Sequence, residues 1–189
     1  PYLIMRIISG KFKSRKIYSG QHKGLRPTLD RVKQTIFDIL FNYIDIENKK
    51  VLDGFSGTGN LGLEALSRKA SLAYFVDNNF KAYKIIKKNV ENLDLNNRSK
   101  IIKNNFYSFV KKFTGNNYFD LVFLDPPYKK NHLEKILLND SFSRICKKNS
   151  IIVAEVEKDY EIMYNKNWKL VNQREISSTK VYFLRKMEG

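Results

Sequence analysis

Four consecutive residues in the second half of the chain combine groups that could hold the amine of a planar base. Asp125, Pro126, Pro127 and Tyr128 supply a carboxylate, carbonyl oxygens on residues of fixed φ, and a flat ring. An exocyclic amine needs two acceptors for its hydrogens, and the Asp125 carboxylate and the Pro126 carbonyl would supply both. The ring of Tyr128 would stack on the base, a contact worth about 1–3 kcal/mol. The alternative is a Pro-Pro turn that only ends a core strand.

The segment before Asp125 is predicted to be the strand that presents these groups. Residues 119–124 read Phe-Asp-Leu-Val-Phe-Leu, and the last four are apolar without alternation. Such a run is typical of a strand buried on both faces of a parallel sheet. Because prolines cannot donate to a sheet ladder, the strand must stop at Asp125. Open α/β sheets bind ligands at the carboxyl ends of their strands, where this carboxylate would lie.

A glycine-rich turn upstream has the layout of a cofactor site. Residues 53–60 read Asp-Gly-Phe-Ser-Gly-Thr-Gly-Asn, after an apolar strand segment and before a predicted helix over 61–68. Strand, glycine turn and helix together suit a nucleotide-like cofactor. Residues 57–62 also satisfy G-x-G-x-x-G, and Asp77 lies 20 residues after Gly57, so a nicotinamide oxidoreductase has to be considered. Against it, Asp53 would attract an ammonium group but would repel a pyrophosphate.

Composition limits the class of protein. The chain has 189 residues, enough for one domain with a full core, and its hydrophobic content of 42% is that of a folded globular protein. No apolar run approaches membrane-spanning length and no signal peptide is visible, so we expect a cytoplasmic protein. The single cysteine, Cys146, excludes an internal disulfide and fits a reducing compartment. Two histidines, His22 and His132, are too few and too scattered for a metal site, so no metal is expected.

The charge of the chain indicates a polyanionic partner. Its 35 Lys and Arg against 19 Asp and Glu give a net charge of +16, which most often indicates nucleic acid, although a Lys- and Asn-rich proteome would also produce it. The distribution is more informative, because nine basic residues and one acid, Asp30, lie between Arg6 and Lys33. We expect RNA contacts in this region, from Arg6, Lys11, Lys13, Arg15, Lys16, Arg26, Thr28 and Arg31.

Periodicity predicts strands that alternate with helices. We expect strands over 5–8, 15–18, 50–55, 72–76, 100–102, 119–124 and 150–156, and an antiparallel pair over 168–174 and 180–185. Helices are expected from an N-cap at Thr28 to about residue 43, and over 61–68, 80–93, 107–113 and 132–138. This order indicates an α/β fold with a doubly wound, mostly parallel sheet, an antiparallel C-terminal strand pair and a basic N-terminal β-hairpin. The simplest partition is an extension over residues 1–27 and one domain over 28–189.

These motifs resemble those of known enzymes. The tetrapeptide at 125–128 resembles the catalytic motif of amino-methyltransferases, which methylate exocyclic nitrogens of adenine, guanine or a glutamine amide, and the glycine turn resembles motif I of S-adenosylmethionine-dependent methyltransferases. Three longer blocks, residues 5–17, 24–37 and 60–68, are similar to the RsmD family, bacterial enzymes that methylate the N2 amine of a guanine in 16S ribosomal RNA. The Arg-Pro-Thr segment at 26–28, which leads to Arg31, is far more specific than the tetrapeptide or the glycine turn.

The resemblance implies a Rossmann-like class I methyltransferase with S-adenosylmethionine as cofactor. By this resemblance the cofactor would contact Asp53, Phe55, Gly57, Gly59, Asp77, Asn78, Asn105 and Phe106. The ribose would lie at Asp77 and the adenine at Asn105 and Phe106, although Asn105 could instead only cap the following helix. Asp125 and the Pro126 carbonyl would hold the amine of an unstacked guanine without a metal. The implied partner is 16S rRNA in the small ribosomal subunit or an assembly intermediate, bound by a monomer.

Two alternatives remain at this point. A DNA adenine-N6 methyltransferase uses the same tetrapeptide but usually carries a separate target-recognition domain, for which this chain has no room. A non-catalytic RNA-binding module would explain the basic N-terminal region. The intact Asp125 and glycine turn argue against that reading.

Overall fold

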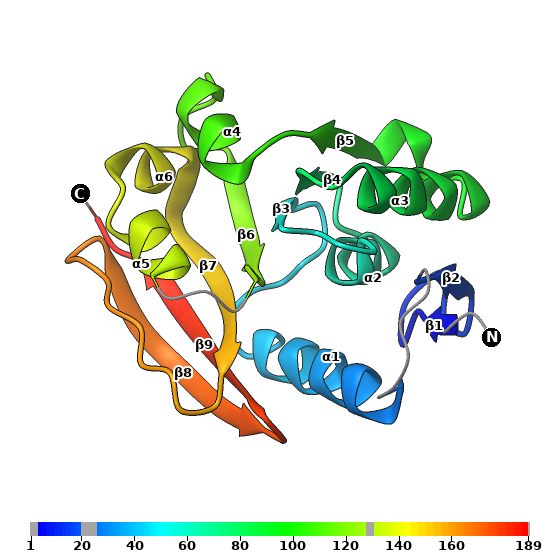
Figure 1. The fold of residues 1–189 in the computed structure, drawn as a ribbon, viewed down its shortest axis with the longest axis horizontal. Coiled ribbons are helices and arrows are strands. Elements are labelled where there is room, and N and C mark those ends of the chain that lie inside the picture. Colours follow the sequence, from blue (N-terminus) through cyan, green and yellow to red (C-terminus); the bar gives the residue numbers. More distant parts are fainter. Residues whose placement is uncertain (1–3, 20–25, 128–130, 189) are drawn as a thin grey trace.

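A seven-stranded sheet forms the centre of the molecule, and the computed structural model describes residues 4–19, 26–127 and 131–188 (Figure 1). The strand order is β5-β4-β3-β6-β7-β9-β8. Neighbours among the first five pair in parallel, whereas β9 runs antiparallel to both β7 and β8. The bounds are β3 (Lys50–Gly54), β4 (Leu72–Asp77), β5 (Ser99–Lys103), β6 (Phe119–Leu124), β7 (Cys146–Glu157), β8 (Trp168–Ile176) and β9 (Thr179–Lys186).

Helices cover both faces of this sheet (Figure 1). One face carries α1 (Arg26–Leu40), α2 (Asn60–Ser67) and α3 (Phe80–Asn92). The other carries α4 (Phe106–Lys112), α5 (His132–Leu137) and α6 (Asp140–Ile145). A short 3-10 helix, η1 (Asn96–Arg98), leads into β5.

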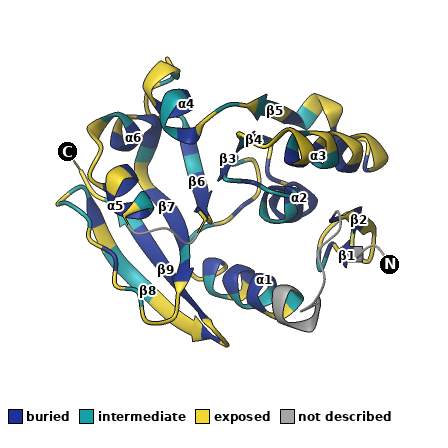
Figure 2. Ribbon diagram, in the orientation of Figure 1, coloured by how far each residue is buried: buried dark blue, intermediate teal, exposed yellow. Residues whose placement is uncertain are grey.

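The central strands are buried on both sides because successive residues point to opposite faces. Val51, Leu121 and Phe123 belong to the core layer with α1–α3, whereas Leu52 and Val122 belong to the layer with α4–α6. All five are fully buried, and the central strands are largely dark blue in Figure 2. Burial on both faces explains the unbroken apolar run from which β6 was predicted.

The N-terminal hairpin, β1 (Ile4–Arg6) and β2 (Lys16–Tyr18), packs beside the helices rather than on the sheet. Met5 pairs with Ile17, and both are buried in the layer that contains α1–α3. The Lys11 N–H donates to the Ser67 carbonyl at 2.9 Å, which fixes the hairpin to the end of α2. The basic extension is therefore built against the helix that follows the glycine turn.

The predicted fold class is confirmed, and the differences lie at element ends and in one short helix that was not predicted. α1 begins at Arg26, so Thr28 lies inside its first turn and the prediction of an N-cap there is wrong. Pro27 is compatible with this earlier start, because its missing N–H costs nothing in a first turn. α6 was not predicted, since a six-residue helix is too short for clear periodicity. The division at residue 27 stays a prediction, and α1 crosses it. None of the helices in the described part of the chain is long and apolar enough to span a membrane.

Candidate active site

Three carboxylates lie near one another at the carboxyl ends of neighbouring strands. Asp53 is on β3, Asp125 directly follows β6, and Glu155 is on β7. Leu124 pairs with Ala154, so Asp125 and Glu155 are the next residues of adjacent parallel strands. By alternation the three acids point to the sheet face covered by α1 and α2. The sequence prediction included Asp53 and Asp125 but missed Glu155. The feature that could have indicated Glu155 is its position as a single acid near the end of a buried apolar strand.

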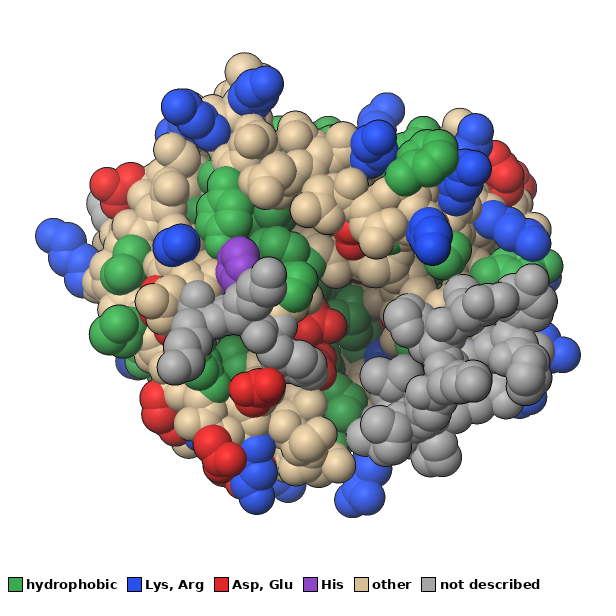
Figure 3. Space-filling model, viewed as in Figure 1, with side chains coloured by type: hydrophobic (Ala, Val, Ile, Leu, Met, Phe, Trp, Pro, Cys, Tyr) green, Lys and Arg blue, Asp and Glu red, His purple; other side chains and the backbone are tan. Residues whose placement is uncertain are grey.

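The three carboxylates line a cavity of about 150 Å³. Figure 3 shows a hollow on this face of the molecule, with acidic side chains beside it. The remaining walls come from the hairpin, α1, the glycine turn and the start of α2: Met5, Val32, Lys33, Ile36, Phe55, Ser56, Gly57, Thr58, Asn60 and Leu61. The space therefore combines walls of apolar and polar residues, Lys33 among them, with an acidic base.

A second cavity of about 490 Å³ lies on the other side of Asp125. Asp125 and Phe55 line both cavities, so the two spaces meet at these side chains. The structure brings together most of the residues predicted for cofactor and base, and adds Tyr107 and His132, whose Oη and Nδ1 lie 2.6 Å apart. The lining residues are Phe55, Asp77, Asn78, Asn105, Tyr107, Asp125, Pro126, Pro127 and His132.

The glycine turn is held in shape by Asp77. Phe55, Gly57 and Gly59 all have positive φ, at 60°, 53° and 77°, a backbone conformation that favours glycine. The Asp77 Oδ2 accepts from the Gly57 N–H at 2.8 Å, and its Oδ1 accepts from the Asn79 N–H at 2.8 Å. Asp77 therefore supports the turn, and it also lines the larger cavity, where each oxygen can accept a further hydrogen bond.

Asn105 and Phe106 have structural roles that change their predicted contacts. The Asn105 Oδ1 caps α4 by accepting from the N–H groups of Tyr107 and Ser108, at 3.0 and 3.3 Å. The Asn105 amide NH2 remains available as a hydrogen-bond donor to a ligand in the cavity. Asn105 therefore suits an acceptor atom of the ligand rather than the adenine amine. Phe106 is buried and packs against Phe55 with ring centroids 5.0 Å apart, so it supports the cavity wall from behind.

The electrostatics of the site favour a positively charged ligand. Burial raises the pKa of Asp53 well above its ordinary value, and the Gly62 N–H bond opposes this, while Asp125 and Asp77 add to it. Burial raises the pKa of Asp125 to about 6. Its side chain stays open to the cleft, so solvent moderates that effect. Burial and the adjacent Asp125 raise the pKa of Glu155 to about 8, against a hydrogen bond from Thr179. A cation here would relieve the repulsion among the three acids.

A buried ion pair, also missed by sequence reasoning, lies beside the site. The Lys33 Nζ is 3.4 Å from the Glu64 Oε2, and it donates to the Arg6 carbonyl at 2.6 Å and to the Asn60 Oδ1 at 2.7 Å. It thereby joins the hairpin, α1 and the first residue of α2. Burial lowers the pKa of Lys33 although Glu64 opposes this. The sequence feature that could have indicated this buried pair is a lysine within the apolar face of α1, next to Val32.

The remaining predicted residues fall into two groups. Tyr128 and the side chains of Arg26 and Thr28 lie outside the described residues. The other predicted RNA contacts are exposed, which leaves them accessible to a partner. They are Arg6, Lys11, Lys13, Arg15, Lys16 and Arg31, of which Arg15 donates to the Asn92 carbonyl at 3.0 Å.

Comparison with known proteins agrees with this geometry. The family model described as Conserved hypothetical protein 95 matches residues 5–185. Ribosomal RNA small subunit methyltransferase D from Buchnera aphidicola is 36% identical over 176 residues, which cover 93% of this chain and 90% of that protein. A solved Escherichia coli protein described as a methyltransferase superposes with a TM-score of 0.84 at 26% identity, over 98% of this chain and 99% of that one. A solved Haemophilus influenzae protein described as a methylase gives a TM-score of 0.80 at 32% identity, over 98% and 100%.

These likenesses extend over nearly the whole chain, including the hairpin, the glycine turn and the tetrapeptide. They confirm the resemblance stated from the sequence motifs. The chain belongs to the family of ribosomal RNA small subunit methyltransferase D.

Proposed function

We propose that the protein transfers a methyl group from S-adenosylmethionine to the N2 amine of a guanine in 16S ribosomal RNA. The observation that carries this proposal is the pair of carboxylates, Asp125 and Glu155, at the ends of adjacent strands. The edge of guanine presents its N2 amine beside the N1–H, so two neighbouring groups are donors. In adenine the N6 amine lies beside the N1 acceptor, which a charged Glu155 would repel. The acidic base of the cavity therefore favours guanine. This preference for guanine requires that the positive charge of the bound cofactor lowers the pKa of Glu155 from its value of about 8.

The two cavities fit the two ends of the cofactor. S-Adenosylmethionine, when bound, supplies a methyl group already activated on a positively charged sulfur. Asp53, at the base of the smaller cavity, would hold its ammonium group, and the pKa of Asp53 would fall on pairing. Asp77, Asn78 and Asn105 would hold the nucleoside end in the larger cavity. Asp125, where the cavities meet, would face the reacting atoms.

The chain's own contribution to chemistry is alignment and proton acceptance. The amine of guanine is a poor nucleophile because its lone pair is delocalised into the ring. The Asp125 carboxylate and the Pro126 carbonyl would accept its two hydrogens, favour a pyramidal nitrogen and free that lone pair. Alignment of the two reactants supplies much of the remaining acceleration. The nitrogen must finally lose one proton, and Asp125, with Glu155 beside it, is the acceptor within reach.

The RNA itself has to be held with the guanine out of its stack. The exposed basic residues of the hairpin, among them Lys11, Lys13, Arg15 and Lys16, would contact phosphates, and the ring of Tyr128 would stack on the base. We propose that the enzyme acts as a monomer on the small ribosomal subunit or an assembly intermediate. Replacement of these four hairpin residues by Ala should weaken RNA binding and flatten its salt dependence without changing cofactor affinity.

The decisive experiment is a methylation assay with tritiated S-adenosylmethionine on 16S RNA, 30S particles and duplex DNA, with the product nucleoside identified by mass spectrometry. N2-methylguanosine from RNA is the expected product. N6-methyladenine from DNA would replace the proposal with the rival amino-methyltransferase. Calorimetry with S-adenosylmethionine and with NAD tests the cofactor separately, because binding of NAD alone would indicate an oxidoreductase.

A further inference from the structure

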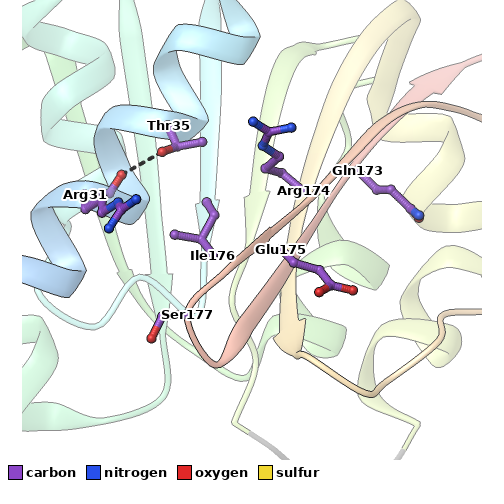
Figure 4. Close-up of a pocket in the computed structure, with 7 residues that line it drawn as sticks. All are labelled: Arg31, Thr35, Gln173, Arg174, Glu175, Ile176 and Ser177. Atoms are coloured by element: carbon purple, nitrogen blue, oxygen red, sulfur yellow. Dashed lines mark hydrogen bonds between the residues drawn. The ribbon is translucent and has the colours of Figure 1, made fainter.

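A groove of about 790 Å³ lies between α1 and the end of the β8–β9 pair, outside the site described above. Its lining comes from two parts of the chain that are far apart in sequence (Figure 4). α1 contributes Arg31 and Thr35, and β8 with the turn after it contributes Gln173, Arg174, Glu175, Ile176 and Ser177.

The groove lies next to the carboxylates, because cross-strand neighbours on β7, β9 and β8 connect the two sites. Glu155 pairs with Val181, and Val181 pairs with Arg174, so all three side chains share the face that α1 covers. Arg174 is two strands from Glu155, or about 10 Å at the usual spacing of strands. α1 forms a wall of both spaces, since Val32 lines the carboxylate cavity and Arg31, the preceding residue, lines the groove.

The groove presents free positive charge. Neither Arg31 nor Arg174 has a side-chain hydrogen bond or ion pair with any other residue that the structure describes. In Figure 4 the Arg174 guanidinium lies on the α1 side of β8, whereas the Glu175 side chain points away from α1. Glu175 is also paired with Lys158 at 3.2 Å, which reduces its repulsion of an anion.

We infer that this groove holds the phosphodiester backbone of the RNA beside the flipped guanosine, with Arg31 and Arg174 as its phosphate contacts. The inference rests on the proposed function. The spacing of about 10 Å between Arg174 and Glu155 leaves room for a guanine between the carboxylates and the groove. Guanidinium groups match phosphate oxygens with two parallel hydrogen bonds. A protein partner fits less well, because Ile176 is the only apolar side chain in the lining and there is no aromatic anchor among these seven residues.

The test compares Arg31→Gln, Arg174→Gln and the double variant with the wild type. Lys169→Gln is the matched control, since Lys169 is an exposed cation on the same strand, five residues and about 16 Å from Arg174. Binding to a 16S RNA fragment is measured by fluorescence anisotropy over a range of salt. Each lost contact should weaken affinity about fivefold at 0.1 M salt and reduce the slope of log K against log salt by about 0.7. The control should match the wild type, and S-adenosylmethionine affinity should be unchanged in all four variants.

Two outcomes would overturn the inference. An unchanged affinity and salt slope in the double variant would show that the groove does not contact phosphates. Loss of methylation on 30S particles with unchanged binding of naked RNA would point to a ribosomal protein instead. The methylation assay tests the proposed function separately, because RNA binding does not depend on methyl transfer. The proposed function fails if the wild-type protein methylates no guanine in RNA.

Discussion

The buried ion pair between α1 and α2 allows the energetics of this fold to be tested with one substitution. The Lys33 and Glu64 side chains are 1% and 0% exposed. Lys33→Met keeps most of the apolar stem and removes the ammonium group. The Arg6 carbonyl and the Asn60 Oδ1 then lose their donor, and each unsatisfied buried acceptor costs about 1–3 kcal/mol.

The carboxylate of Glu64 limits the damage because it has other partners. Its oxygens accept from the N–H groups of Ile8 and Ser9 at 2.8 and 3.0 Å, and the Arg68 Nε lies 3.0 Å away. Glu64 therefore keeps a counter-charge, and the loss should stay at the low end of the roughly 3–5 kcal/mol seen when a buried pair is broken. We expect Lys33→Met to lower the free energy of unfolding by about 3 kcal/mol.

Thermal unfolding followed by circular dichroism measures this effect. For a chain of this size about 3 kcal/mol corresponds to a fall in Tm of about 9 °C. Lys147→Met is the control, because the Lys147 side chain is 39% exposed and pairs with Asp120 at 2.8 Å near the surface, a contact worth about 1 kcal/mol or less. If the two variants melted within 2 °C of each other, the reasoning from burial and lost donors would be refuted.

Three further predictions concern the site. Gly62→Ala places a Cβ 2.4 Å from the Phe75 ring and 3.0 Å from the Asp53 Oδ2, so urea unfolding should show a loss of about 1–3 kcal/mol; equal or greater stability would mean that the ring moves freely. Methyl transfer should decline as the pH falls through about 6, because protonation of Asp125 removes an acceptor, whereas Asp125→Asn should lower kcat and lose this dependence. An Asn variant with the wild-type pH profile would assign the titration to another group. The fold raises the pKa of the Glu155 carboxyl from 4.5 to about 8. Between pH 4.5 and about 8 the folded protein keeps a proton that the unfolded chain releases, so the free energy of unfolding falls as the pH rises over this range. Glu155→Gln should therefore be more stable than the wild type at pH 9 and equal to it near pH 4 in denaturant unfolding, and no gain at pH 9 would contradict this account.

Local patterns in the sequence were sufficient for the fold class and for part of the site. β6 was predicted with its bounds because an apolar run and two prolines define both its burial and its end. The glycine turn was recognised from the spacing of its glycines, and the positive φ of Gly57 and Gly59 is a conformation that glycine adopts without steric cost. The start of α1 was predicted wrongly, since Thr28 is a good N-cap residue by type, yet the helix already begins at Arg26.

Only the tertiary structure decided which distant side chains meet. Glu155 lies beside Asp125 because of the register of two parallel strands, and hydrophobic periodicity carries no information on register between strands. Lys33 reads as a solvated lysine until the hairpin and α2 close around it and supply its acceptors. Asn105 and Asp77 were predicted from their positions after strands, but the structure decided which of their oxygens the backbone already uses. The sequence by itself determined the strands and the glycine turn, because these depend on neighbouring residues. The acidic pair, the buried ion pair and the arginine groove depend on long-range packing, which only the folded chain defines.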